Sequence, residues 1–307
     1  MVTTGMGVAN VLRQARATCD DAGLHGSFLV RDLNTGDELG LEPDLEFPAA
    51  SLVKVPLAMV THERIRRGEL DPARQILIRP NRDTVPGPTG LSRFRHPATV
   101  AVEDLLYLST AISDGAAADA LFELTSPAQV TAGLRRIGLS GIVVRHPISN
   151  LTDTPAERFT PQEGHLAQSL AITAATAGQG HPVPQLDVSR ASTGSARAFV
   201  DLLHELWRPS VVDPEVAGRV RELMGDNVLR QRLAPDFSSD AARWSSKTGT
   251  LLNLRHEIGV VEHVNGQTYA VAALTQSRVP AIVQPLAEAA MAHVARTLHD
   301  ELRLASG

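Results

Sequence analysis

The chain has 307 residues, of which 43% are hydrophobic and 21% charged, and its formal net charge at pH 7 is −5. This composition is typical of a globular protein and gives no support to a nucleic-acid or anionic-membrane partner. The single cysteine, Cys19, excludes an internal disulfide. The sequence has neither an apolar run of membrane-spanning length nor the pattern of a secretory signal. We therefore expect a cytoplasmic protein, secreted only if a leader has been removed.

In chain order, the first predicted elements are an amphipathic helix over 8–23 and strands over 26–33 and 37–43. Helical apolar spacing then dominates, and the predicted helices cover 51–67, 102–112, 116–125, 130–138, 195–207 and 214–225. The proline- and glycine-rich stretch 79–98 and the mixed stretch 145–194 are predicted loops, the second with a helical piece.

Strand patterns return near the C-terminus, over 242–252, 256–264 and 267–276, with a hairpin turn at Asn265-Gly266. A helix over 281–304 is predicted to close the chain.

This order predicts an α/β (α+β) fold in which both termini build one antiparallel sheet flanked by helices. We assign residues 1–48 and 210–307 to an α/β subdomain. Residues 49–209 form an inserted all-helical subdomain with a long loop around 145–194. No internal repeat is present.

Only two of the 29 basic residues are lysines, Lys54 and Lys247. Lys54 follows Ser51 by three positions in a predicted helix, so the two side chains share a face. A partly buried lysine can lose its proton and act as a base toward a serine hydroxyl, whereas arginine cannot. The same spacing also arises by chance on helix surfaces, where the lysine is a solvated residue.

Three motifs in order strengthen the catalytic hypothesis: SLVK at 51–54, SDG at 113–115 and KTG at 247–249. Their contexts are a helix start, a turn between helices and a strand. With them the chain resembles the class A β-lactamase-like and penicillin-binding serine hydrolase family over nearly its whole length. The resemblance implies a site in the cleft between the two subdomains.

Four catalytic roles follow from the resemblance. Ser51 would attack a carbonyl and form an acyl-enzyme. Lys54 would accept its proton, or provide the field that lets another base do so. Ser113 would relay a proton to the leaving group. Lys247 would bind a substrate carboxylate and tune the Ser113 hydroxyl.

The resemblance also implies substrate-binding roles beside the third motif. Thr248 and Thr250 would donate hydrogen bonds to the carboxylate, and the backbone N–H groups of Ser51 and Thr250 would form an oxyanion hole. Gly249 would allow close approach of the strand. Arg255 is either a second carboxylate clamp or a surface strand residue.

Two departures from the family pattern affect the chemistry. Gly115 replaces an asparagine whose amide would contact the substrate. The region 145–153 lacks the glutamate that activates water for deacylation, and nearby Glu157 and Glu163 stand in unmatched surroundings. Deacylation of a β-lactam should therefore be slow. The SDG variant also resembles a β-lactamase-like protein of clavulanic-acid biosynthesis, only partly, because that protein has an additional N-terminal domain.

The leading hypothesis is a serine hydrolase, or esterase, acting on carboxylate-bearing β-lactam amides or esters, with weak β-lactam turnover. Two alternatives stay open: a D-Ala-D-Ala carboxypeptidase and a non-hydrolytic protein that binds a carboxylate ligand. The 11 histidines form no metal-ligand motif, and no nucleotide-binding loop is present, so we expect no metal or cofactor. The expected partner is a small molecule, and the expected state a monomer.

Overall fold

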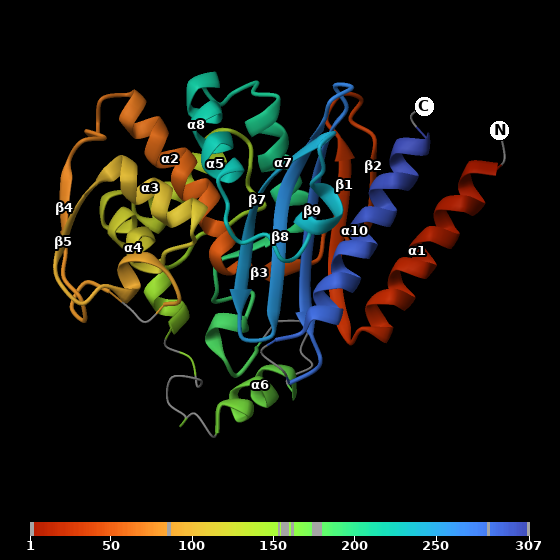
Figure 1. Ribbon diagram of the computed structural model, residues 1–307, viewed down its shortest axis with the longest axis horizontal. Helices are drawn as coiled ribbons and strands as arrows, with labels where there is room; N and C mark the ends of the chain where they lie inside the picture. Colours follow the sequence, from red (N-terminus) through yellow and green to blue (C-terminus); the bar gives the residue numbers. More distant parts are fainter. Residues whose placement is uncertain are drawn as a thin grey trace.

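The computed structural model describes residues 3–84, 87–152, 154, 160, 163–173, 180–280 and 283–305 (Figure 1). Its helices are α1 (Thr3–Asp21), α2 (Lys54–Arg66), α3 (Val102–Ala111), α4 (Gly115–Leu124), α5 (Pro127–Arg136), α6 (Gly164–Thr173), α7 (Ala196–Trp207), α8 (Pro214–Gly225), α9 (Ala234–Phe237) and α10 (Pro285–Ala305). The 3-10 helices used below are η1 (Ala50–Val53), η2 (Gly90–Arg93) and η3 (Ile148–Thr152).

One antiparallel sheet forms the centre of the molecule, with strand order β2-β1-β9-β8-β7. Its members are β1 (Leu24–Asp32), β2 (Glu38–Leu41), β7 (Ala242–Leu251), β8 (Leu254–His263) and β9 (Thr268–Ser277). The N-terminal strand β1 pairs with the C-terminal strand β9, so the two ends of the chain are joined by hydrogen bonds. The predicted sheet from both termini is confirmed.

Both faces of the sheet are covered, and side chains alternate between two apolar clusters as strand geometry requires. Phe28 and Val30 belong to the cluster under α1 and α10, whereas Leu29 belongs to the cluster shared with the other helices. Figure 1 shows α1 and α10 side by side on one face of the sheet. Helix α7 packs against β1 and β9 from the other face.

Helices α2, α3, α4 and α5 lie on the side of the sheet away from α1 in Figure 1. They share one apolar core with the inner face of the sheet. Helix α7, which the prediction places in the inserted subdomain, contacts the sheet. The proposed subdomain boundaries remain a prediction.

The main differences from the predicted elements are short strands. Residues 46–48 (β3) pair with 193–195 (β6), and 75–78 (β4) pair with 98–101 (β5). A strand of three or four residues is too short to produce a readable alternation. The predicted loop 79–98 also contains η2 and ends in the first residue of β5.

Within the described part of the chain, no helix is both long and apolar enough to cross a membrane. Cys19 is a buried residue of α1, and this burial raises the pKa of its thiol to about 11. A thiol with such a pKa stays protonated at neutral pH and is a poor nucleophile.

Candidate functional site

Ser51 lies on a short turn that leads into a helix. The chain leaves β3, passes through η1, and enters α2 at Lys54. Ala50, the residue before Ser51, has a φ of 46°, a left-handed conformation that is rare for a residue with a side chain. Ser51 is partly exposed, whereas Lys54 is only 1% exposed.

Ser113 occupies the turn between α3 and α4 with a φ of 59°, again in the left-handed region. The next residue, Asp114, fixes this turn. Its carboxylate accepts hydrogen bonds from Ala116 N at 2.9 Å, Leu91 N at 2.6 Å and Ser92 Oγ at 3.0 Å. It therefore caps α4 and ties η2 to the same place. The carboxylate of Asp114, the middle residue of the SDG motif, therefore stabilises the turn that carries Ser113.

The two lysines meet at the Ser113 hydroxyl. Lys247 Nζ lies 2.9 Å from Ser113 Oγ, and Lys54 Nζ lies 3.3 Å from the same oxygen. Lys54 also donates to the Ser113 carbonyl at 2.7 Å, and Lys247 donates to the Thr248 carbonyl at 2.8 Å. Residues from a helix, a turn and a strand, far apart in the sequence, thus converge on one hydroxyl.

Burial changes the acid–base properties of both amines. It lowers the pKa of Lys54 from 10.5 to about 8, against the opposing influence of the Asp114 and Asp119 carboxylates. Burial also brings the pKa of Lys247 well below its usual value, and the charges of Lys54 and Arg232 lower it further. A site with two such amines can hold or release a proton near neutral pH.

Strand β7 brings the KTG motif against the turn that carries Ser51. A Cβ atom added to Gly249 would lie 3.2 Å from the Ala49 carbonyl oxygen and 3.2 Å from Leu52 Cγ. Glycine therefore permits a close approach of strand and turn. Among the strands that the structure describes, β7 is an edge strand of the sheet, and its edge away from β8 has no strand partner.

The Ser51 hydroxyl itself makes no hydrogen bond to another residue in the described ranges, since the Lys54 amine bonds to Ser113 instead. The direct Ser51–Lys54 contact expected from their spacing is thus absent from this arrangement. The oxygen is partly exposed and free to take part in other interactions.

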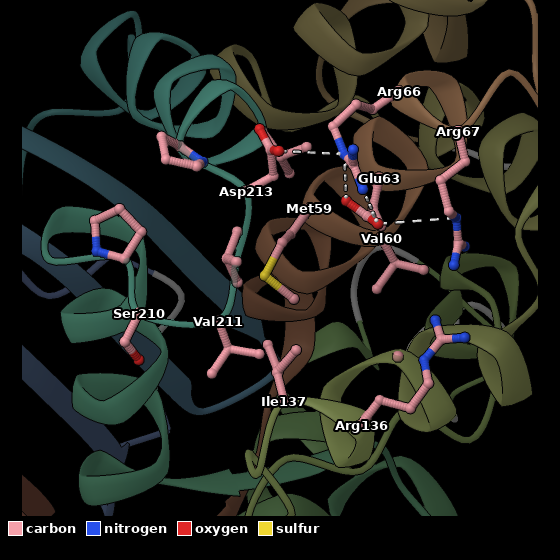
Figure 2. A pocket seen from close by; sticks show the side chains of 15 residues that line it. Met59, Val60, Glu63, Arg66, Arg67, Arg136, Ile137, Ser210, Val211 and Asp213 are labelled. Carbon is pink, nitrogen blue, oxygen red and sulfur yellow. Dashed lines mark hydrogen bonds and ion pairs between the residues drawn. The ribbon is translucent and has the colours of Figure 1, made fainter.

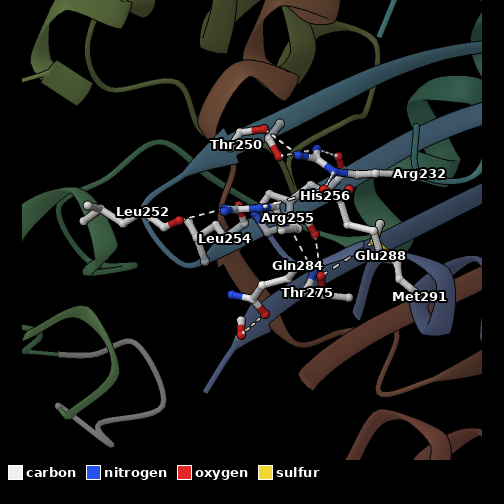
Figure 3. A network of polar contacts seen from close by, with 12 residues as sticks. Arg232, Thr250, Leu252, Leu254, Arg255, His256, Thr275, Gln284, Glu288 and Met291 are labelled. Atoms are coloured by element: carbon white, nitrogen blue, oxygen red, sulfur yellow. Dashed lines mark hydrogen bonds and ion pairs between the residues drawn. The ribbon is translucent and has the colours of Figure 1, made fainter. Parts of the chain in front are cut away.

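Arg232 is a residue that sequence reasoning missed. Its guanidinium is 3% exposed and donates to Thr250 Oγ1 at 2.7 Å, to the Gly249 carbonyl at 3.0 Å and to the Glu288 carboxylate at 2.9 Å (Figure 3). It places a fixed positive charge beside the exposed Thr250 at the end of the KTG strand. No motif marks it, because only folding brings the segment before α9 to β7.

Arg255 lies opposite Thr250 in the β7–β8 pair, yet it is only 6% exposed. Its Nη1 donates to the carbonyl oxygens of Leu252 and Leu254 at 2.6 and 2.7 Å, within the hairpin turn. The surface position considered from the sequence is wrong, whereas a role as carboxylate clamp remains a prediction. Figure 3 shows its side chain directed to Leu252, while Arg232 is directed to Thr250.

His256 links the sheet to the nucleophile turn. The Thr275 N–H lies 3.1 Å from its Nδ1, so this nitrogen accepts, and Nε2 must carry the proton that it donates to the Pro48 carbonyl at 3.0 Å. Burial lowers the pKa of the ring to about 4, which keeps it neutral. Pro48 stands three residues before Ser51, so His256 helps to position that turn.

The other site residues predicted from the sequence fall as follows. Gly115 is the first residue of α4, and a Cβ there would lie 3.3 Å from Ile148 Cγ2 of η3. Thr248 is buried in β7. Glu157 lies outside the described residues, and Glu163 is exposed and accepts a hydrogen bond from Thr160 Oγ1 at 2.8 Å. None of these observations identifies a deacylation base.

Asp119 is the acidic group that connects α4 with η3. Its carboxylate accepts from the backbone N–H groups of Ile148 at 2.6 Å and Ser149 at 3.2 Å. Burial raises the pKa of this carboxyl, although the two N–H bonds and the Lys54 charge oppose the shift. Its oxygens thus have a structural role at the edge of the site.

Known proteins with the same architecture include penicillin-interacting enzymes. PBP-A, solved as a mutant in an acyl-enzyme complex with penicillin G, has a TM-score of 0.74 to this chain at 18% identity, covering 96% of this chain and 97% of that one. A β-lactamase from Sphaerobacter thermophilus DSM 20745 has a TM-score of 0.75 at 20% identity, covering 97% of this chain and 98% of that one. At these identities the likeness shows the fold.

Sequence comparison gives the family. A curated relative, the β-lactamase regulatory protein BlaB of Streptomyces cacaoi, is 62% identical over 305 residues, which is 96% of this chain and 98% of that protein. The family model described as the beta-lactamase enzyme family matches residues 10–302. The chain therefore belongs to the beta-lactamase enzyme family.

Proposed function

We propose that this protein is a serine hydrolase whose Ser51 is acylated by a carboxylate-bearing β-lactam or ester. The observation that carries the proposal is the Ser113 hydroxyl held between the Lys54 and Lys247 amines, beside the turn that bears Ser51. Buried amines of lowered pKa next to a hydroxyl are suited to proton transfer, and few structural roles require two of them.

In the proposed reaction, the Lys54 amine leaves the Ser113 carbonyl and turns toward Ser51. The Ser51 oxygen then attacks the substrate carbonyl carbon and its proton passes to the neutral Lys54 amine. The bond from that carbon to the leaving nitrogen or oxygen then breaks. Ser113 donates its proton to the leaving atom and recovers one from a neighbouring lysine. Each proton is conserved, and the product is an acyl ester on Ser51.

The substrate carboxylate is proposed to lie at the end of β7. Thr250 Oγ1 is exposed there, and the guanidinium of Arg232 reaches the same oxygen. Charge-assisted hydrogen bonds from such a pair favour an anion. Esters or β-lactams that carry a carboxylate are thus preferred over neutral ones.

Hydrolysis of the acyl ester is proposed to be slow. Glu163 is exposed and bonded to Thr160, and Asp119 is engaged by two backbone N–H groups. Neither is in an arrangement typical of a general base beside Ser51. A long-lived acyl-enzyme is therefore part of the proposal, together with a monomeric state and a cytoplasmic location.

A chromogenic cephalosporin and penicillin G test the assignment. We expect slow colour development and, by mass spectrometry of the intact protein, an increase equal to the mass of penicillin G. Ser51→Ala should abolish both, whereas Ser126→Ala, at the start of α5, should keep both. An adduct that survives in Ser51→Ala would refute the proposal.

A regulatory role is the second candidate, and the name of the 62% identical relative, a β-lactamase regulatory protein, favours it. In that case the protein binds or is acylated by a β-lactam and does not turn it over. A stoichiometric adduct without multiple turnovers would support this candidate over the hydrolase. Release of D-alanine from a D-Ala-D-Ala peptide would instead support the carboxypeptidase alternative.

A further inference from the structure

A second concave site lies at the far end of α2 from Ser51 (Figure 2). The cavity has a volume of about 480 Å³ and is bounded by the C-terminal half of α2, the C-terminal end of α5 and the segment 209–214, which leads into α8. This volume falls within the range of small-molecule sites, roughly 300–1,000 Å³.

The interior of the cavity is apolar. Met59 and Val60 come from α2, Ile137 follows α5, and Val211 and Val212 come from the segment before α8. Figure 2 shows Met59, Ile137 and Val211 pointing toward one another. Val211 is 62% exposed. An apolar ligand group would cover it.

The wall made by the 209–214 segment is held in place before any ligand binds. The Glu205 carboxylate accepts hydrogen bonds from the backbone N–H groups of Ser210 at 2.7 Å and Val212 at 2.8 Å. Asp213 accepts from Glu215 N at 2.9 Å and caps α8. A cavity with fixed walls loses little conformational freedom when it is filled.

The rim of the cavity carries a net charge of +1, from three arginines and two carboxylates. Glu63 pairs with Arg66 at 2.9 Å and with Arg67 at 3.8 Å. Arg67 also pairs with Glu69 at 3.0 Å. Asp213 pairs with Arg66 at 3.6 Å. The Arg136 guanidinium makes no hydrogen bond or ion pair with any other residue in the described ranges.

The uncompensated charge lies next to a notch in the rim. A smaller cavity of about 190 Å³ adjoins the first and shares Val60, Arg67 and Arg136 with it. In Figure 2 the guanidinium groups of Arg67 and Arg136 lie on the same side of Val60, from α2 and α5 respectively. Two guanidinium groups on either side of a gap can bind one anionic headgroup between them.

We propose that this cavity binds a small monoanionic carboxylate with an apolar body. The body fills the space lined by Met59, Ile137 and Val211, and the carboxylate lies between Arg67 and Arg136. The net charge of +1 matches one negative charge. The site is separate from the residues around Ser51, and nothing in the proposed acyl transfer uses it.

Octanoate is the probe, and octanamide, which has the same tail and no charge, is its neutral partner. Isothermal titration calorimetry should give saturable binding of octanoate and binding of octanamide that is about tenfold weaker. Ser51→Ala should bind octanoate as the unmodified protein does, because the ligand does not occupy the acylation site.

Arg136→Ala should weaken octanoate binding about tenfold or more, and Arg67→Ala should have a similar effect. Arg135→Ala is the matched control, since this neighbouring arginine lines neither cavity and should leave binding unchanged. Thermal unfolding is measured first, and Arg136→Gln replaces the alanine variant if that variant does not fold.

Three results would overturn the proposal. The first is no binding of octanoate up to its solubility limit. The second is equal affinity for octanoate and octanamide. The third is an Arg136 variant that is folded and binds octanoate as tightly as the Arg135→Ala control.

Discussion

The two ends of α2 carry basic residues under opposite conditions. At its first residue, Lys54 is 1% exposed, and burial lowers the pKa of its amine to about 8. At its last turn, Arg66 is exposed and pairs with Glu63, which raises the pKa of its guanidinium. The buried amine can change its charge near neutral pH, whereas the exposed guanidinium cannot.

This difference explains why the rare lysines matter. A chain that uses arginine for its other basic positions keeps lysine at two positions where the cation is completely enclosed by protein. Arginine there would be a permanent buried charge. At the exposed end of α2 a permanent charge is useful, because a guanidinium that does not titrate can bind an anion over a wide pH range.

The largest expected effect comes from exchanging the two kinds of cation. Lys54→Arg should slow acylation by penicillin G by about 10³-fold, because the guanidinium cannot accept a proton from Ser51. The reciprocal change Arg67→Lys should leave the acylation rate within about twofold. Time-resolved mass spectrometry measures both, and unimpaired acylation of Lys54→Arg would show that the buried end does not depend on a titrating amine.

The pH dependence sharpens the same comparison. If neutral Lys54 is the base, the acylation rate should fall about tenfold for each pH unit below its pKa and level off above it. The pKa of about 8 places the change of slope near pH 8. Octanoate binding at the other end of α2 should stay constant from pH 6 to about pH 9, since guanidinium groups do not titrate there.

The stability of the folded protein should also depend on pH through Lys54. Because the pKa of Lys54 in the folded protein is below its unfolded value of 10.5, the unfolded chain binds more protons between about pH 8 and 10.5. The contribution of Lys54 to stability therefore rises with pH across this window and is lost as pH falls through 8. Urea unfolding of the protein and of Lys54→Met would separate this trend from other titrations, because the variant should lack it.

His256 provides a smaller effect at the buried end. His256→Asn keeps an acceptor for the Thr275 N–H and loses the bond to Pro48, whereas the longer His256→Gln can still donate to Pro48. We expect acylation to be slowed about tenfold in the asparagine variant and restored in large part in the glutamine variant. Equal acylation rates in folded His256→Asn and His256→Gln would show that the bond to Pro48 does not position the Ser51 turn.

The smallest effect is expected at the exposed end. Arg66→Ala removes ion pairs with Glu63 and Asp213, both of which are accessible to water. Such pairs contribute little to the free energy of unfolding, because water screens them. Urea unfolding should therefore give nearly the same midpoint for Arg66→Ala and the unmodified protein, and a clear loss of stability would mean that Arg66 contributes more than surface pairing.

Much of the fold was readable from the amino-acid sequence because its signals are local. The apolar periodicity of the long helices, the Asn265-Gly266 turn and the strand patterns at both ends predicted the confirmed sheet. The short strands β3 to β6 were not predicted, since their pairing depends on partners far along the chain.

The sequence by itself determined which residues could take part in a reaction: two serines and two lysines in three ordered motifs. Only the tertiary structure decided that both lysines contact one hydroxyl, that Arg232 reaches Thr250 and that His256 bonds to Pro48. The cavity beside Arg136 likewise joins α2, α5 and the segment before α8. The physical reason is that pKa, charge pairing and cavities depend on burial and on neighbours in space, which periodicity along a chain does not specify.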